Sequence, residues 1–203
     1  MRIIDISPLV TQSSPVYPGD DPLSVKFCNS EKTIVSTFQM SAHLGAHIDA
    51  PLHLKRCGDV SEVDLSALIG PCQVMQVNRR KAIEVEDLDE VRCSRVLLKT
   101  GFGPREKWNS DFPYLSEQAV RYLAQAGVRV IGIDTPSIDS ESDENLSSHV
   151  LAIDCGMLIL ENLDLTEVGR GLYHLVALPL KIQGLEASPV RAVLIDNKEN
   201  PIG

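Results

Sequence analysis

The stretch "SAHLGAHIDAPLHL", residues 41–54, alternates between polar and apolar side chains, and this alternation decides how the segment folds. In an extended segment, successive side chains point to opposite sides. The even-numbered side is wholly apolar and suits a core: Ala42, Leu44, Ala46, Ile48, Ala50, Leu52 and Leu54. The odd-numbered side carries four polar side chains: His43, His47, Asp49 and His53. A helix would bring the first two histidines together, but it would turn Asp49 away and would be broken by Pro51.

The polar side of this segment predicts a metal site. Three of the five histidines of the chain lie here beside a carboxylate, and this donor set suits zinc, manganese, iron or nickel. A straight strand would hold His43 and His47 roughly 13 Å apart, too far for one ion. We therefore expect a bend at Gly45 and a turn at Pro51. A single histidine on a strand is usually an ordinary polar residue, whereas three that alternate with an aspartate are hard to obtain by chance.

Further ligands have to come from elsewhere in the chain, and spacing alone leaves their roles open. His149 lies on a predicted helix, and Glu161 ends the strand predicted after it. Functional side chains of α/β folds often lie at such strand ends. By spacing, each is either a ligand or an ordinary surface residue, and for His174, within a predicted strand, we favour a structural role.

Short apolar runs bounded by turn residues predict a strand-rich chain. The predicted strands cover residues 2–7, 35–40, 72–77, 95–100, 128–134, 157–161, 172–180 and 190–195. Helices are predicted at 116–127, with Ser116 as the N-cap, at 143–156 and, more weakly, at 84–91. This order predicts a single α/β domain over residues 1–203, with a mixed sheet that we expect to curl toward a barrel.

Composition and charge exclude several classes of protein. The formal net charge of −9 leaves no basic face for nucleic acid. No apolar run approaches the roughly 18 residues that a membrane span needs, and Asp5 and Pro8 interrupt the N-terminal run too early for a secretory signal. The five cysteines are widely spaced without a C-x-x-C pair, which favours free thiols in a reducing cytoplasm.

Residues 43–53, "HLGAHIDAPLH", resemble the H-x-G-[TA]-H-x-D-x-P-x-H signature of the cyclase-like metal-dependent hydrolases. This family includes the bacterial kynurenine formamidases (arylformamidases), to which the chain is most similar, and the isatin hydrolases. Later blocks resemble the family in the same order, among them "GVRVIGIDTPSID", "GMLILENLDL" and residues 173–194. The resemblance implies a fold of the swivelling β/β/α type: a mixed, barrel-like sheet with helices packed outside, assembled as a homodimer or homotetramer.

The resemblance also implies a site for two divalent metal ions, usually zinc, with manganese as the alternative. The implied ligands are His43, His47, Asp49, His149 and Glu161. The first three would hold one ion, and Asp49 would bridge to a second ion held by the last two. His53 would be a catalytic acid/base rather than a ligand.

The implied reaction is hydrolysis of N-formyl-L-kynurenine to L-kynurenine and formate, in tryptophan degradation. A metal-bound water, with its pKa lowered to about 7, would supply hydroxide, and His53 would protonate the leaving nitrogen. Tyr17 and Phe38 are candidates for a wall against the aromatic ring, whereas no residue for the polar end of the substrate is identified. Ser147-Ser148-His149 lacks the G-x-S-x-G elbow of a serine nucleophile.

Two alternatives remain open. The first is a cyclase-family hydrolase of a cyclic amide or ester, such as an isatin-like lactam or a lactone. It stays open because the formamidase pattern usually has Trp where this chain has Tyr17, and Asp-Ala where it has Ser147-Ser148. The second is a catalytically silent metal-binding protein, against which the retention of His53 argues, since a storage site needs no acid/base.

Overall fold

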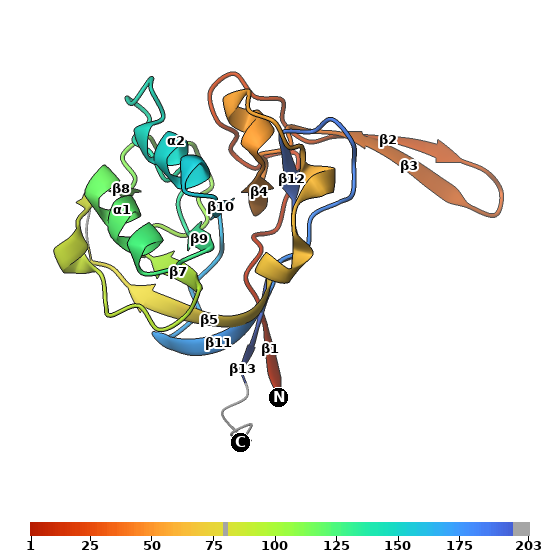
Figure 1. Cartoon of the computed structure of the whole chain (residues 1–203). Helices are drawn as coiled ribbons and strands as arrows, with labels where there is room; N and C mark the ends of the chain where they lie inside the picture. The colour runs from red at the N-terminus through yellow and green to blue at the C-terminus, as the bar shows by residue number, and fades with distance from the viewer. Residues whose placement is uncertain (79–80, 197–203) are drawn as a thin grey trace.

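The computed structural model describes residues 1–78 and 81–196, in which nine strands pair into one strongly curled sheet (Figure 1). The strand order is β1-β13-β11-β5-β7-β9-β10-β4-β12. Four adjacent strands, β5, β7, β9 and β10, run parallel, and the other neighbours are antiparallel. The strands are β1 (Arg2–Asp5), β4 (His47–Asp49), β5 (Ile69–Gln76), β7 (Arg95–Lys99), β9 (Val130–Ile133), β10 (Leu158–Glu161), β11 (Gly171–Val176), β12 (Ala187–Pro189) and β13 (Val193–Asp196). The predicted mixed, barrel-like sheet is thus confirmed as a half-barrel.

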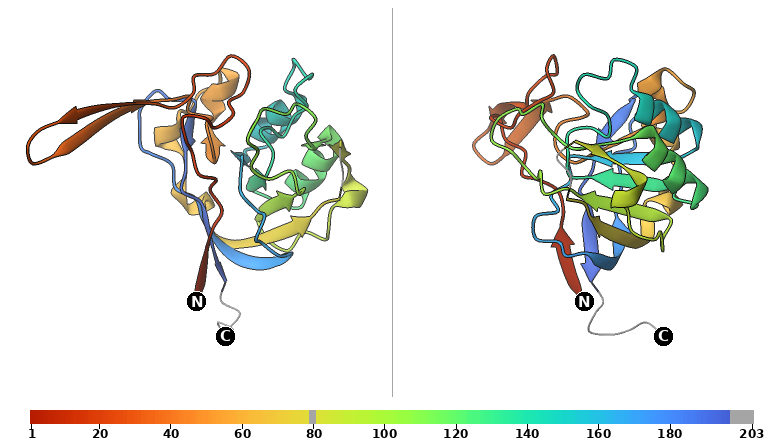
Figure 2. Two further views of the ribbon diagram at one scale, coloured as in Figure 1. Left: turned by 180° about the vertical axis from the view of Figure 1, so that it is seen from behind. Right: turned by 90° about the vertical axis from the view of Figure 1, so that its left-hand side faces the viewer.

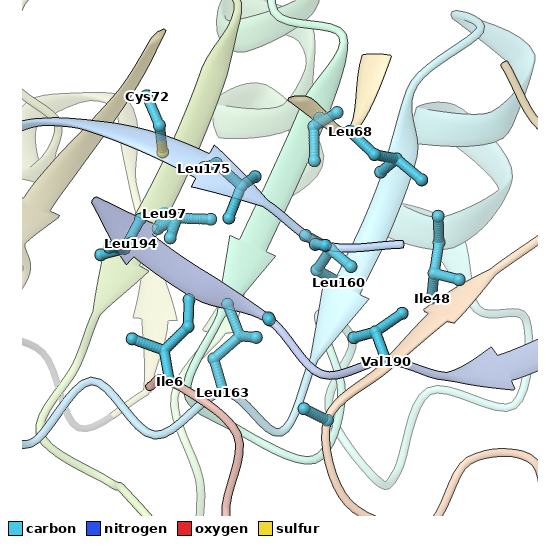
Figure 3. Close-up of a cluster of buried hydrophobic side chains, with 14 of the residues drawn as sticks. Ile6, Ile48, Leu68, Cys72, Leu97, Leu160, Leu163, Leu175, Val190 and Leu194 are labelled. Carbon is cyan, nitrogen blue, oxygen red and sulfur yellow. The ribbon is translucent and has the colours of Figure 1, made fainter. Parts of the chain in front are cut away.

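The two faces of the sheet carry separate cores. Inside the curl, side chains from most strands meet in one cluster, shown in Figure 3; its labelled members are Ile6, Ile48, Leu68, Cys72, Leu97, Leu160, Leu163, Leu175, Val190 and Leu194. On the outer face a second cluster joins the strands to the two α-helices, α1 (Glu117–Gln125) and α2 (Ser147–Asp154). Strand β10 shows the alternation, since Leu160 points into the first cluster and Ile159 into the second.

Local signals explain where the helices lie. Ser116 caps α1 by accepting a hydrogen bond from the backbone N–H of Ala119, as predicted. Helix α2 begins later than predicted, because the Asp143 side chain accepts hydrogen bonds from the N–H groups of Asn145 and Ser147 and holds a turn there. Among the residues that the structure describes, no helix is long and apolar enough to cross a membrane.

The helix predicted at 84–91 is wrong. The structure has only a 3₁₀ turn at Val85–Asp87. The Glu84 side chain accepts a hydrogen bond from the backbone N–H of Asp87, and the Asp87 side chain accepts one from the backbone N–H of Glu84. The chain is extended again at Leu88. Five of the eight residues in this segment are acidic. Like charges at helical spacing repel one another, and short aspartates compete for backbone groups, so the apolar spacing does not suffice to form a helix.

A hairpin of β2 (Ser24–Asn29) and β3 (Ile34–Gln39) projects from the body of the molecule (Figures 1 and 2). The sequence predicted β3 but not β2. Residues paired across the hairpin share a face, and one face is mainly apolar, with Val25, Phe27, Ile34 and Phe38. Three of these side chains stay exposed, at 66% for Phe27, 71% for Ile34 and 60% for Phe38. A further short pair, β6 (Ala82–Ile83) and β8 (Tyr114–Leu115), lies beside the main sheet.

Candidate metal centre

Strand pairing brings the first group of polar side chains together. In the antiparallel pair β4–β10, His47 lies opposite Glu161 and Asp49 lies opposite Ile159, so these side chains point to the same, outer face of the sheet. Ile48 points the other way into the inner core. Helix α2 covers the outer face and adds the buried His149. The predicted alternation is therefore confirmed at the strand, and residues far apart in the sequence meet above it.

The group is buried and closely spaced. Asp49 is 1% exposed, and its two carboxylate oxygens face different histidines. Oδ1 lies 3.1 Å from Nδ1 of His43 and 3.6 Å from Nε2 of His47, while Oδ2 lies 3.4 Å from Nε2 of His149. Glu161 completes the group, 3.4 Å from Nε2 of His47 and 3.2 Å from Nε2 of His149. The three histidines among the five predicted ligands thus converge on the carboxylates of the other two, Asp49 and Glu161.

Gly45 and Pro51 make the bends that the sequence predicted. Gly45 has a φ of +75°, which favours glycine, and a Cβ there would come within 2.5 Å of the Val10 side chain. The chain bends at this point and returns His43 to Asp49. After β4, Pro51 begins a 3₁₀ turn that ends at Leu54 and carries His53, whose ring centroid lies 4.6 Å from that of His43.

Three buried atoms of this group have no hydrogen-bond partner among the described residues: Nε2 of His47 and both carboxylate oxygens of Asp49. Buried polar atoms are normally paired, so such atoms require an explanation. Ligand atoms from His43, Asp49 and His53, and likewise from His47, Asp49 and Glu161, lie within 4.8 Å of one another. Imidazole and carboxylate donors gathered in this way fit a divalent metal ion.

Hydrogen bonds behind the histidines orient them for this purpose. Nδ1 of His47 donates to the Gly45 carbonyl at 2.9 Å, and Nδ1 of His149 donates to the Asp139 carboxylate at 2.7 Å. Both rings therefore turn Nε2 toward the centre, where its lone pair can bind a metal ion. Metal-binding histidines commonly show this arrangement. Asp139 also accepts from the backbone N–H groups of Ser148 and His149 and so holds the start of α2.

The carboxylates make the centre strongly attractive to cations. Burial lowers the pKa of His43, but Asp49, with Glu161 and Glu186, outweighs it and raises the pKa to about 9. In the same way burial lowers the pKa of His149, whereas the charge of Glu161 and the hydrogen bond to Asp139 raise it well above the usual value. Protons are thus bound where metal ions would replace them. The pKa of His53 is instead lowered, chiefly by burial, which favours the neutral imidazole.

A pocket of about 440 Å³ opens from this centre. The histidines, Glu161 and Glu186 line one end, and aromatic side chains form part of the wall. Tyr17 and Trp108 pack edge to face with their ring centroids 5.0 Å apart. Of the two candidates for an aromatic wall, Tyr17 lines the pocket. Phe38 does not, because it lies on the projecting hairpin, outside the lining of this pocket.

Comparison with known proteins agrees with this geometry. The family model "Putative cyclase" matches residues 4–140, which include the histidine-rich segment of β4. The kynurenine formamidase of Delftia acidovorans is 42% identical over 202 residues, which cover 95% of this chain and 97% of that one. The chain belongs to the cyclase family.

Solved structures of the cyclase family share the fold along nearly the whole chain. A predicted metal-dependent hydrolase from Bacillus stearothermophilus superposes with a TM-score of 0.85 at 30% identity, over 95% of this chain and 97% of that one. Isatin hydrolase A of Labrenzia aggregata superposes with a TM-score of 0.78 over 95% of this chain and 93% of that one. At 20% identity, the second likeness shows the shared fold alone.

Sequence reasoning missed several residues of this cyclase-family site. Asp139 lies in a block that resembles the family, but no spacing rule links it to His149 ten positions later. Trp108 is the only tryptophan of the chain, a signal that could have drawn attention to its loop. Arg105 and Lys107 line the pocket from the same loop. His174 lies on β11, outside the pocket lining. This position agrees with a structural role for His174.

We expect Asp139→Asn to weaken metal binding by about 10- to 100-fold while the fold is kept. Substitution of a residue that hydrogen-bonds to a metal-binding histidine typically has an effect of this size. An amide oxygen still accepts from the start of α2, but it no longer supplies the charge that orients His149. Competition with a chromophoric chelator measures the affinity. Ser140→Ala, at the next and half-exposed position, is the control. Unchanged affinity in Asp139→Asn would show that His149 needs no such support.

Proposed function

We propose that this protein hydrolyses an aryl formamide, N-formyl-L-kynurenine, to L-kynurenine and formate, and so acts on a C–N bond other than a peptide bond. The observation that carries the proposal is the set of orphaned buried atoms on His47 and Asp49, at one end of a pocket with aromatic walls. The formamidase from Delftia acidovorans, at 42% identity, supports the choice of substrate. We propose His43, His47, Asp49, His149 and Glu161 as ligands of two divalent ions, zinc or, in its place, manganese.

The chain's own residues have separate tasks in this proposal. Bound divalent ions would polarise the formyl carbonyl and lower the pKa of a water molecule. Asp49 and Glu161 supply the negative charge that balances the ions. The ring centroid of His53 lies 5.7 Å from that of His149, and we propose that His53 acts beside the ions rather than as a ligand. There it takes a proton from the attacking water and delivers one to the leaving aniline nitrogen. Tyr17 and Trp108 orient the aromatic ring.

The test is a substrate panel run on protein stripped with a chelator and then reloaded with zinc or with manganese. The substrates are N-formyl-L-kynurenine, isatin and a simple lactone. We expect release of formate from the first only after reloading, because the hydroxide that attacks it depends on the ion. Equal turnover by the stripped protein would contradict a metal-dependent reaction.

The second candidate function is hydrolysis of a cyclic amide or ester. The fold shared with isatin hydrolase A supports it. The same histidines and carboxylates would hold the metal ions for this reaction. Cleavage of isatin or the lactone without release of formate would replace the first candidate by this one. Metal binding with no turnover of any substrate would favour a silent metal-binding protein.

We also propose that the chain works as a single domain, assembled into a homodimer or homotetramer in the cytoplasm. The five cysteines, all within the described ranges, form no disulfide, which suits a reducing compartment. The exposed apolar face of the β2–β3 hairpin supports assembly, because an isolated two-stranded hairpin is marginally stable in water.

Light scattering should give two or four times the 22.2 kDa mass of the chain. The double variant Phe27→Ser/Ile34→Ser should shift this mass toward a single chain, because it removes two of the exposed apolar side chains. Lys26→Ser, on the opposite face of the hairpin, is the control. A wild-type protein that has the mass of one chain would contradict the assembly.

A further inference from the structure

The lining of the pocket carries groups of both charges. The carboxylates of Glu161 and Glu186 line it beside the histidines, 3.4 Å from His47 and 3.3 Å from His43. Of the lysines and arginines of the described chain, two line the pocket, Arg105 and Lys107, and both come from the loop between β7 and β8. Within residues 1–78 and 81–196 neither forms an ion pair with a carboxylate. In a protein with a net charge of −9, two unengaged cations on one pocket wall indicate a place for an anionic group.

The loop that carries them is held in position from both sides. At its start, the backbone N–H and hydroxyl of Thr100 and the N–H of Gly101 donate to the buried Asp134 carboxylate, at 2.6 to 3.1 Å. Further on, the Trp108 indole N–H donates to Glu141 at 2.9 Å. These contacts hold both ends of the segment that carries Arg105 and Lys107, whose exposed side chains line the pocket.

Arg105 is further oriented by stacking. Its guanidinium carbon lies 4.6 Å from the centroid of the Phe102 ring. A guanidinium that stacks on an aromatic face keeps the N–H donors of its edge available, and that edge matches the two oxygens of a carboxylate. Phe102 also lines the pocket, and so the same contact connects the aromatic wall to the cationic group.

We propose that Arg105, assisted by Lys107, binds the carboxylate at the amino-acid end of the substrate and so selects aryl formamides that carry an amino acid over neutral ones. This inference rests on the proposed function. The substrate would then span the pocket, with its formyl group at the histidines and its carboxylate at the loop. Neutral substrates such as isatin lack the group that Arg105 recognises, so the loop would disfavour them.

The kinetic test compares two substrates in the variants Arg105→Gln and Lys107→Gln. One substrate is N-formyl-L-kynurenine; the other is 2-formamidoacetophenone, which keeps the formamide and aryl ketone but lacks the amino acid. We expect Arg105→Gln to lower kcat/KM for the first by about 10- to 100-fold, mainly through KM, because charged hydrogen bonds have this strength. For the second, the change should stay within about twofold, since no charged contact is lost. Glu106→Gln, in the same loop but outside the pocket lining, is the control.

A binding test separates this inference from the proposed function. Trp108 is the only tryptophan and lies in the pocket wall, so its fluorescence reports binding of L-kynurenine and of 2-aminoacetophenone without turnover. If the wild type hydrolyses no formamide, weaker binding of L-kynurenine alone in Arg105→Gln would still support the inference while the proposed function fails. The inference would be overturned if Arg105→Gln affected both substrates equally, or both ligands of the binding test equally, or none of them. Arg105 would then have a structural role or no role in binding.

Discussion

Asp49→Asn is expected to abolish turnover, by roughly 10³-fold or more, and to leave the protein without its full metal content. Within residues 1–78 and 81–196, Asp49 is the one carboxylate that lies within 3.6 Å of three histidines at once, His43, His47 and His149. Asparagine keeps the shape but removes the negative charge and one of the two oxygen donors. Each oxygen of Asp49 faces different histidines, so a single substitution should impair both of the proposed ion positions.

The measurement for Asp49→Asn combines metal content after dialysis with the rate of formate release. Glu186→Gln is the matched control, because Glu186 lies 3.3 Å from Nε2 of His43 and also lines the pocket, but its side chain is 39% exposed. We expect it to keep its metal and to lose less than about tenfold in rate, as partly exposed charges interact weakly. An Asp49→Asn protein with full metal content and wild-type rate would refute the bridging role.

His53→Ala is expected to lower kcat by about 10²- to 10⁴-fold without loss of metal, the usual range for a missing general acid/base. This result distinguishes two roles that geometry alone allows. His53 belongs to a group of possible ligands with His43 and Asp49, so a role in metal binding is open on distance. If it were a ligand, metal content would fall together with the rate.

The measurement for His53→Ala is kcat with metal content determined on the same sample. His174→Ala is a suitable control, since His174 is a histidine on β11 outside the pocket lining. Full activity of His53→Ala would assign the proton transfers to another group. A fall in both metal content and rate would move His53 into the ligand set.

The fold was predictable where local periodicity carried the signal. The apolar run of strand β10 predicts its bounds to within a few residues. The apolar spacing and the serine cap of helix α1 do the same for that helix. The helix predicted at 84–91 does not form, because repulsion among its acidic side chains outweighs the apolar spacing. The first strand of the projecting hairpin, β2, is not predicted because Lys26 interrupts the apolar residues of 24–29 and leaves no continuous apolar run.

What the sequence determined by itself about this protein is the polar side of residues 43–53, with its bend at Gly45, because alternation and a glycine turn are properties of neighbouring residues. Only the tertiary structure decided that Glu161 lies across a strand pair from His47 and that α2 places His149 above Asp49. The same holds for Asp139 behind His149 and for Arg105 in the pocket wall. These contacts join residues from separate elements, and their distances depend on sheet register and helix packing, which no local pattern encodes.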